Sequence, residues 1–217
     1  MNRRRFLGLA TASVVTGVAG CGGSEASGES IRDHPAAADL DAQPHLGSLD
    51  GHVVLTFEDP SCPTCRDFHE GTVPQIQSEI VEPGKGAYVV RTYPVIYPWG
   101  APATQALEAT FARDADAFWS LLAHYFETQS AFSTDNVLDR TATFLDGETD
   151  LDGQAVVADA RERAYDEQVQ ADISAADNAG LGESTPIILL FEDGEFVTKV
   201  TGSVSYEIVA RALGESE

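Results

Sequence analysis

The feature that most constrains the fold is a pair of cysteines, Cys62-Pro63-Thr64-Cys65, at the point where a predicted strand gives way to a helix. Residues 53–57 are apolar and largely β-branched, which predicts a buried strand, and apolar residues recur at helical spacing after the pair. The cysteines therefore lie at a helix N-terminus, where unpaired backbone N–H groups and the helix dipole stabilise an anion. This placement predicts that Cys62 has a lowered pKa and attacks as a thiolate, with Cys65 one turn behind it.

The charge of the chain restricts its partners. Asp and Glu number 35 against 13 Lys and Arg, which gives a formal charge of −22, and the acids are spread along the whole chain. Such a surface repels nucleic acids and anionic lipids, so we expect neither as a partner. A dispersed carboxylate surface suits very high salt, where screening shortens charge interactions to a few ångströms. We predict a haloadapted exterior; an ordinary acidic extracytoplasmic protein is the alternative.

The N-terminus has the pattern of an export signal. Residues 2–7, Asn-Arg-Arg-Arg-Phe-Leu, resemble a twin-arginine motif. The apolar run that follows has about 15 residues, and a membrane span needs about 20. Residues 18–21, Val-Ala-Gly-Cys, resemble a lipobox. We predict that residues 1–21 are a signal peptide and that Cys21 carries a lipid anchor on the outer face of the cytoplasmic membrane. An uncleaved anchor, or a cut without lipid, is the alternative.

The remaining chain divides into a tether and a domain. Residues 22–44 begin with Gly, Ser and Glu and continue with polar residues and prolines, which predicts a flexible tether. Residues 45–217 predict one domain, in which a strand, a helix and a strand precede a helical block at about residues 100–180. An apolar strand from Ile187, a turn at Asp193-Gly194, a second strand and a final helix follow the block.

The helical block has three predicted parts. Apolar residues from Leu107 to Tyr125 define one face, interrupted at Arg113-Asp114, and a short helix follows near residues 137–145. Asp152 is placed to cap a third helix that ends at Gly180. Earlier in the chain, Pro74 should kink or restart the helix that follows the cysteines.

Residues 45 to about 213 resemble the DsbA-like branch of the thioredoxin superfamily. The two cysteines with the Arg66-Asp67-Phe68-His69 segment resemble the active-site helix of that family, and Trp119 resembles part of its insertion helix. Thr185-Pro186, directly before an apolar strand, resembles its cis-proline signature. The resemblance implies an α/β, thioredoxin-like fold with an all-helical insertion between the βαβ and ββα halves.

The same resemblance implies a protein disulfide oxidoreductase. In this family Cys62 would attack or be attacked, and the more buried Cys65 would resolve the mixed disulfide. Thr185 and Pro186 would pack against the cysteines, with the Thr185 backbone pairing to a substrate strand, and Pro63 and Thr64 would support the site. The implied partners are substrate proteins with thiols or disulfides and a redox partner that regenerates the site; no cofactor is implied.

The direction of the reaction stays open at this point. Oxidation of substrates is favoured, and a reductase for cytochrome or metal-site maturation is the alternative.

One departure from the family pattern is Thr56, which stands six residues before Cys62 where many members carry a buried acid. Glu58 and Asp59 follow on the same strand, but nothing in the pattern says that their side chains face inward.

Metal binding and simple packing are the alternatives to a redox role for these residues. The two cysteines could be half of a zinc site, but four ligands are needed and only His69 lies near them in sequence. A non-enzymatic lipoprotein that binds copper or zinc is therefore the weaker hypothesis, and we predict no metal site.

We expect His69 to be a surface or packing residue rather than a base. Trp99 is expected to pack, with a place in a substrate groove as the alternative. No further dimerisation segment is visible, so a monomer is expected.

Overall fold

The computed structural model describes residues 28–215. The predicted signal peptide and Cys21 lie outside the described residues. A five-stranded sheet forms the centre, in the order β1-β3-β2-β4-β5. The strands are β1 (His45–Gly47), β2 (His52–Glu58), β3 (Gly86–Thr92), β4 (Ile187–Glu192) and β5 (Glu195–Thr201). β2 and β3 are parallel, and the other neighbours are antiparallel. Residues 53–58 of the central β2 are all buried, so the sheet is covered on both faces.

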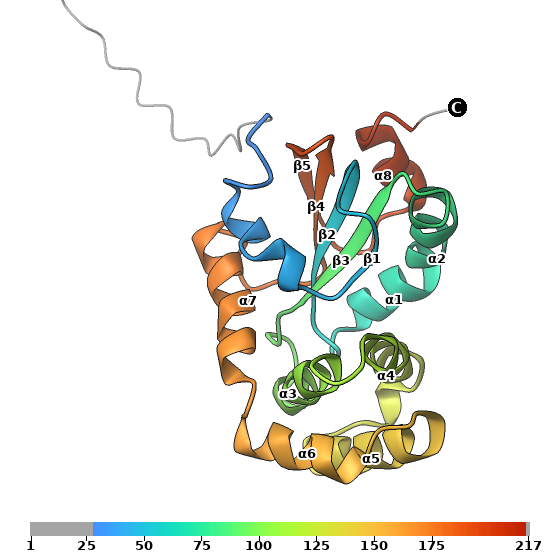
Figure 1. The fold of residues 1–217 in the computed structure, drawn as a ribbon, viewed down its shortest axis with the longest axis vertical. Coiled ribbons are helices and arrows are strands. Elements are labelled where there is room, and N and C mark those ends of the chain that lie inside the picture. Colours follow the sequence, from blue (N-terminus) through green and yellow to red (C-terminus); the bar gives the residue numbers. More distant parts are fainter. Residues whose placement is uncertain (1–27, 216–217) are drawn as a thin grey trace, which may run out of the picture.

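Each face of the sheet has its own cover (Figure 1). α1 (Pro63–Gly71), α2 (Val73–Ile76), the π-helical turn η3 (Gln77–Val81) and α8 (Tyr206–Ala212) lie on one face. α7 (Asp166–Asn178) lies on the other. Side chains alternate between the two covers along β2, because successive residues of a strand point to opposite faces. Val54 packs with Phe68 on the α1 side, and Leu55 packs with Ala176 on the α7 side.

The segment after α1 bends where the sequence places its proline. α1 ends at Gly71, and the chain restarts as α2 with Pro74 in the first turn. A proline is tolerated there because the first N–H groups of a helix have no intrahelical acceptor. The predicted restart at Pro74 is therefore what the structure shows.

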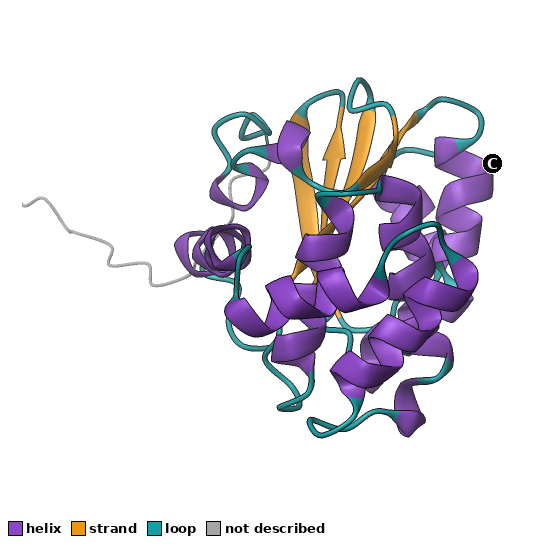
Figure 2. Cartoon of the chain, turned by 60° about the horizontal axis from the view of Figure 1, so that its bottom comes forward, coloured by secondary structure: helices purple, strands orange, loops and turns teal. Residues whose placement is uncertain are grey.

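The predicted helical insertion is confirmed between β3 and β4. It contains α3 (Gly100–Phe111), α4 (Ala115–Glu127), the 3-10 turn η4 (Gln129–Ala131), α5 (Val137–Glu148), α6 (Gly153–Glu162) and α7. Viewed from the bottom of Figure 1, α3 to α6 lie in front of one end of the sheet (Figure 2). Their apolar faces continue the core on the α1 side, since Leu107, Phe118 and Leu122 belong to the same buried cluster as the two cysteines.

Two helix boundaries differ from the sequence prediction. The apolar face from Leu107 to Tyr125 belongs to two helices, because the Asp114 carboxylate accepts a hydrogen bond from Ala117 N–H and begins α4. The third predicted helix is divided into α6 and α7, because Arg163 takes the left-handed conformation with φ 54° and ends α6. The predicted cap of α6 by Asp152 is present, with its carboxylate accepting from Ala155 N–H at 3.0 Å.

The segment expected to be a flexible tether packs on the domain wherever the structure describes it, so that prediction is wrong for residues 28–44. Residues 35–37 and 40–42 form two 3-10 turns, η1 (Pro35–Ala37) and η2 (Leu40–Ala42), and Ala36 is fully buried. The His34 ring packs on Phe196 with ring centroids 4.8 Å apart. The small alanines that resemble linker residues instead fit closely against α7.

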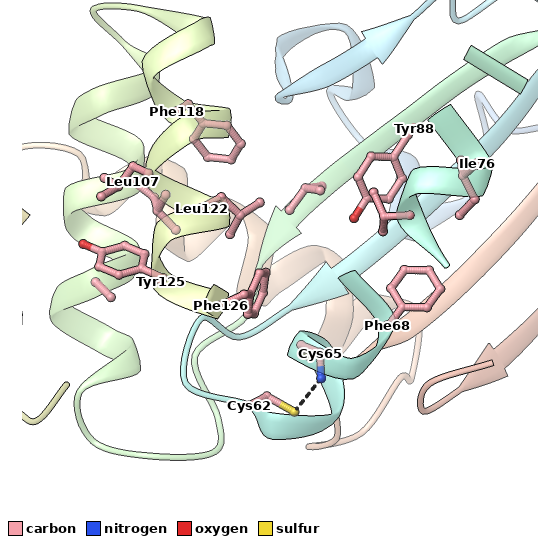
Figure 3. Packing of buried hydrophobic residues seen from close by; sticks show 14 of the residues in the cluster. Cys62, Cys65, Phe68, Ile76, Tyr88, Leu107, Phe118, Leu122, Tyr125 and Phe126 are labelled. Carbon is pink, nitrogen blue, oxygen red and sulfur yellow. Dashed lines mark hydrogen bonds between the residues drawn. The ribbon is translucent and has the colours of Figure 1, made fainter. Parts of the chain in front are cut away.

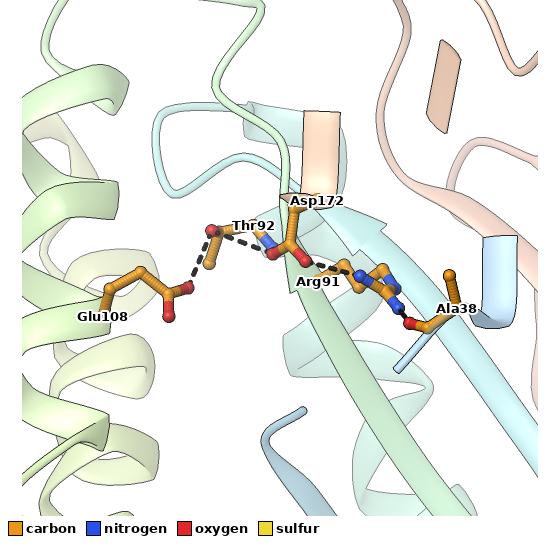
Figure 4. A network of polar contacts seen from close by, with 5 residues as sticks. All are labelled: Ala38, Arg91, Thr92, Glu108 and Asp172. Carbon is orange, nitrogen blue, oxygen red and sulfur yellow. Dashed lines mark hydrogen bonds and ion pairs between the residues drawn. The ribbon is translucent and has the colours of Figure 1, made fainter. Parts of the chain in front are cut away.

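A buried polar cluster connects this segment, the sheet and the insertion (Figure 4). The Arg91 guanidinium on β3 donates to the Asp172 carboxylate on α7 at 2.7 Å and to the carbonyl of Ala38. The Thr92 hydroxyl donates to Glu108 on α3 at 3.2 Å. Burial beside Asp172 raises the pKa of Glu108 to about 8, so Glu108 keeps its proton near neutral pH. One carboxylate is thus left to balance Arg91.

No helix among residues 28–215 has the length and apolar character needed to cross a bilayer.

Candidate active site

The two cysteines lie where the carboxyl end of β2 meets the start of α1. Cys62 is the N-cap of α1, and Pro63 occupies the first helical position, which its fixed φ favours. The Cys62 sulfur accepts a hydrogen bond from Cys65 N–H at 3.4 Å (Figure 3). A sulfur in the capping position thus receives the donor that a capping hydroxyl usually receives, which favours the thiolate.

Cys62 is the acidic thiol of the pair. Its pKa is lowered to about 6, chiefly by a hydrogen bond from the Cys65 thiol and further by the backbone N–H groups of Cys65 and Thr64. Burial opposes this shift, because only 3% of Cys62 is exposed. The prediction of an acidic Cys62 therefore agrees with the geometry, but the largest contribution comes from the second thiol rather than from the helix backbone.

Cys65 has the opposite environment. It is fully buried, and burial raises the pKa of its thiol far above the usual range. Its hydrogen bond to Cys62 and the nearby Glu58 carboxylate act in the same direction. Both cysteines are free thiols in this structure. At neutral pH the pair therefore holds one anion, on Cys62, and one proton, on Cys65.

The other candidate residues of the site lie close to the two cysteines. The peptide bond between Thr185 and Pro186 is cis. The Cys62 sulfur lies 3.3 Å from the Thr185 carbonyl oxygen, and it donates to that oxygen when it is protonated. Pro63 and Thr64 are exposed at the surface beside the pair. The sheet thus brings together two segments that lie 123 positions apart in the chain.

Glu58 is a buried acid next to the cysteines, which sequence reasoning left undecided. It is 1% exposed, and its carboxylate accepts hydrogen bonds from the Tyr88 hydroxyl and, at 2.8 Å, from Thr56. Burial raises its pKa to about 7 against the lowering effect of these two donors. Strand alternation was the missed signal, because Glu58 shares the face of Val54, which α1 covers.

Asp59 also points inward rather than to solvent. Its carboxylate accepts from Ser61 N–H at 2.7 Å and from Ile96 N–H at 2.7 Å. The Ser61 hydroxyl in turn accepts from Tyr97 N–H at 3.0 Å. These bonds hold the loop after β3 against the segment that leads into Cys62. Asp59 therefore orders the walls of the site.

Gln129 is a site residue that the sequence did not indicate. It lies in η4 of the insertion, and its side-chain amide donates to the carbonyls of Pro60 and Cys62, both at 3.0 Å. One buried side chain thus ties the insertion to the backbone of the attacking cysteine. An isolated glutamine in a helical block carries no periodic signal, so only the tertiary structure locates it.

The side chains that the sequence left open between packing and a role in catalysis or binding are packing residues. The His69 ring packs on Phe126 with centroids 4.8 Å apart, and burial lowers its pKa to about 4. Trp99 is 7% exposed, and one edge of it lines a groove beside the cysteines. The partly buried Trp119 packs on Tyr88. Across the described part of the chain, no group of three or more His, Cys, Asp or Glu side chains is placed to hold a metal ion.

Comparison with known families agrees with this geometry. A family model described as thioredoxin matches residues 39–213, which is most of the chain and includes both cysteines and the Thr185-Pro186 segment. The chain belongs to the thioredoxin family. The predicted DsbA-like, thioredoxin-like fold with its helical insertion is confirmed by solved structures. BdbD from Bacillus subtilis in its oxidised form superposes with a TM-score of 0.70 at 20% identity, over 87% of this chain and 97% of that one.

Two solved DsbA proteins have the same fold. DsbA of Chlamydia trachomatis superposes with a TM-score of 0.67 at 17% identity, over 80% of this chain and 90% of that chain. Alpha-DsbA1 of Wolbachia pipientis gives 0.64 at 18% identity, over 80% and 89%.

Curated relatives match a shorter part of the chain. Disulfide bond formation protein D of Bacillus subtilis is 27% identical over 107 residues, which is 49% of this chain and 47% of that protein. The probable disulfide bond formation protein D of Bacillus anthracis is 30% identical over 88 residues, which is 40% of this chain and 41% of that protein. The matches therefore span less than half the length of these two relatives.

Proposed function

We propose that this thioredoxin-family chain is a thiol–disulfide oxidoreductase that forms disulfides in other proteins through Cys62 and Cys65. The observation that carries the proposal is the contrast between the two thiols. The pKa of Cys62 is lowered to about 6, and that of the adjacent Cys65 is raised by burial. A stabilised Cys62 thiolate favours the reduced form of the pair, and a pair with a stable reduced form is a strong oxidant of other thiols.

The reaction begins from the Cys62–Cys65 disulfide. A substrate thiolate attacks the Cys62 sulfur, the bond between the two cysteines breaks, and Cys65 leaves with the electron pair and takes up a proton. A second substrate thiolate then attacks the substrate sulfur of the mixed disulfide and releases Cys62 as a thiolate. The substrate gains one disulfide, and the protein gains two electrons. A redox partner must remove these electrons, so we propose such a partner as well as the substrate proteins.

Glu58 is the group we propose for proton transfer to Cys65. Its raised pKa of about 7 means that it carries a proton for a substantial fraction of the time near neutral pH. Its charge also interacts with the Cys65 thiol. Glu58 takes the role expected of a buried acid, although Thr56 occupies the position where many family members carry that acid.

The direction of the reaction is set by the reduction potential. A value of about −120 mV favours oxidation of substrates, and a value of about −270 mV favours the alternative of a reductase that serves cytochrome or metal-site maturation. Equilibration with glutathione, followed by alkylation of free thiols, measures this potential. The acidity of Cys62 favours the first outcome.

The activity itself is tested with a reduced, unfolded protein as substrate. The oxidised chain should restore the substrate's disulfides, and the Cys62→Ser variant should not, because it lacks the sulfur that forms the mixed disulfide. Cys65→Ser cannot form the internal disulfide, but its Cys62 thiolate can attack a disulfide of the same substrate in its oxidised form. The substrate thiolate leaves, and the mixed disulfide should accumulate because Cys65 is absent to resolve it. A Cys62→Ser chain that keeps full activity would contradict the proposal and favour the weaker hypothesis of a metal-binding lipoprotein.

We also propose that the domain works outside the cytoplasm as a monomer held to the membrane through lipid on Cys21. Support comes from the twin-arginine and lipobox patterns of residues 1–21 and from the acidic composition, which suits high salt. Mass spectrometry of the membrane fraction tests the anchor. A mature chain that begins at Cys21 with a lipid mass is the expected result, and an unmodified Cys21 would contradict it.

A further inference from the structure

A groove opens beside Cys62, between the active-site helix and the insertion. Its volume is about 520 Å³. Three segments line it: residues 61–66 around the cysteines, residues 97–99 after β3, and residues 129–134 after α4. A polypeptide whose cysteine reacts with Cys62 therefore passes directly next to this groove.

The base of the groove is aromatic and fixed in place. The rings of Trp99 and Phe132 have centroids 5.3 Å apart, and Phe132 also packs on Tyr125 at 5.2 Å. Tyr97 stands at the rim and is 52% exposed, which makes it one of the two large apolar side chains with high exposure among residues 28–215. A rigid aromatic base with an exposed aromatic rim suits one large apolar side chain from a partner.

The charge of the groove is opposite to that of the chain. Among the described residues that line it there is no Asp or Glu, and Arg66 is one of the lining residues. The Arg140 guanidinium lies over the Phe132 ring, 5.4 Å from its centroid. Arg66 is paired with Asp67 at 3.0 Å, but the two side chains are 36% and 58% exposed, so this pair contributes little and a partner's carboxylate can replace it. In a chain of formal charge −22, the groove next to Cys62 is thus lined by a cation and by no acid among the described residues.

The groove also offers hydrogen bonds to an extended backbone. Ser130, Ser133 and Thr134 are exposed along one wall, and each hydroxyl both donates and accepts. An unfolded segment keeps its backbone N–H and C=O groups free, whereas a folded protein has already paired most of them. The wall therefore fits an unfolded segment better than a folded surface.

We propose that this groove makes the chain selective: among segments that flank the reacting cysteine of a substrate, it favours an aromatic side chain with a neighbouring carboxylate over an aromatic side chain with a basic neighbour. The inference rests on the proposed oxidoreductase function and adds a substrate preference to it. Aromatic contact with Tyr97 and Trp99 supplies affinity, and Arg66 with Arg140 supplies the preference for acidic segments.

The test uses four peptides with two cysteines each, which combine Phe or Ala with Glu or Lys at the two positions next to one cysteine. The second-order rate constant for their oxidation is measured at the lowest salt at which circular dichroism shows every variant folded. The wild-type chain should oxidise the Phe peptides about tenfold faster than the Ala peptides. It should oxidise the Glu peptides about threefold faster than the Lys peptides.

The variants address each part of the proposal. Arg66→Gln combined with Arg140→Gln should bring the Glu-to-Lys ratio to about one, and Tyr97→Ser should lower the Phe-to-Ala ratio. Arg211→Gln is the matched control, because Arg211 is an exposed arginine on α8 outside the groove, and it should leave both ratios unchanged.

Oxidation of dithiothreitol distinguishes a failure of the proposed oxidoreductase function from a failure of the groove proposal. If the wild-type chain does not oxidise dithiothreitol, the proposed function fails. If it oxidises dithiothreitol but treats the four peptides alike, the groove proposal alone is overturned. The same conclusion follows if the double arginine variant keeps the wild-type preference for Glu.

Discussion

Replacing Glu58 by glutamine should stabilise the reduced protein at high pH and leave it unchanged at low pH. Burial raises the pKa of Glu58 from 4.5 to about 7. Below pH 4.5 both the folded and unfolded states bind the proton, so burial of the carboxyl carries no ionisation cost. Between pH 4.5 and 7 the unfolded state loses its proton while the folded state keeps it, and the folded state becomes progressively less favourable. Above pH 7 the cost is complete.

The size of this effect follows from the shift. One pKa unit corresponds to about 1.4 kcal/mol, so the full cost is about 3 kcal/mol. A glutamine side chain at this position keeps the oxygen that accepts from Tyr88 and Thr56 but has no proton to lose. The free energy of unfolding of Glu58→Gln should therefore exceed that of the wild type by up to about 3 kcal/mol at about pH 8, with little difference at about pH 4.5.

Urea unfolding of the reduced proteins at about pH 4.5, 6 and 8 measures this dependence, with Glu79→Gln as an exposed control on the same face of the sheet. The control should show no comparable dependence on pH. A difference between Glu58→Gln and the wild type that is the same at all three pH values would refute the reasoning, because Glu58 would then act only through its hydrogen bonds.

Three further substitutions test the elements that hold the site. Asp172→Asn should lower the free energy of unfolding by about 3–5 kcal/mol in urea titrations, because Arg91 stays buried without its counter-charge. Gly100→Ala should lower the melting temperature, since a Cβ there would lie 2.4 Å from the Asp59 carboxylate, and overpacking of this kind costs about 1–3 kcal/mol. Gln129→Ala should raise the pKa of the first active-site thiol, measured by thiolate absorbance in the ultraviolet, because the carbonyl of that cysteine loses a donor; an unchanged titration would contradict this role.

The sequence predicts the sheet well because its signals are local. The two cysteines mark the junction of β2 and α1, and the Asp193-Gly194 turn marks the β4–β5 hairpin. The thioredoxin-like architecture follows from the order of such elements. Helix ends are harder to locate. The polar interruption at Arg113-Asp114 does not show by itself that one helix ends and another begins, and apolar periodicity continues across Arg163 although the chain turns there.

The missed parts of the site depend on contacts between distant segments. Glu58 becomes a buried acid only because α1 covers its face of β2, and the sequence pattern alone does not say where the end of that strand is covered. Gln129 reaches Cys62 across 67 positions, and the groove exists only where the insertion meets the active-site loop. The packing of residues 28–44 was missed because small residues resemble a linker until the surface that they fit is known.

The most direct test is a titration of the reduced protein with Cys21 replaced by serine, followed by thiolate absorbance in the ultraviolet, with the same chain carrying Cys62→Ser as the reference. One thiolate should form near pH 6 and be absent from the reference. No second thiolate should follow in the range of an ordinary cysteine, because Cys65 keeps its proton. A transition at about 8.5, the value of an ordinary cysteine, would contradict the central claim that this fold holds an anion on Cys62.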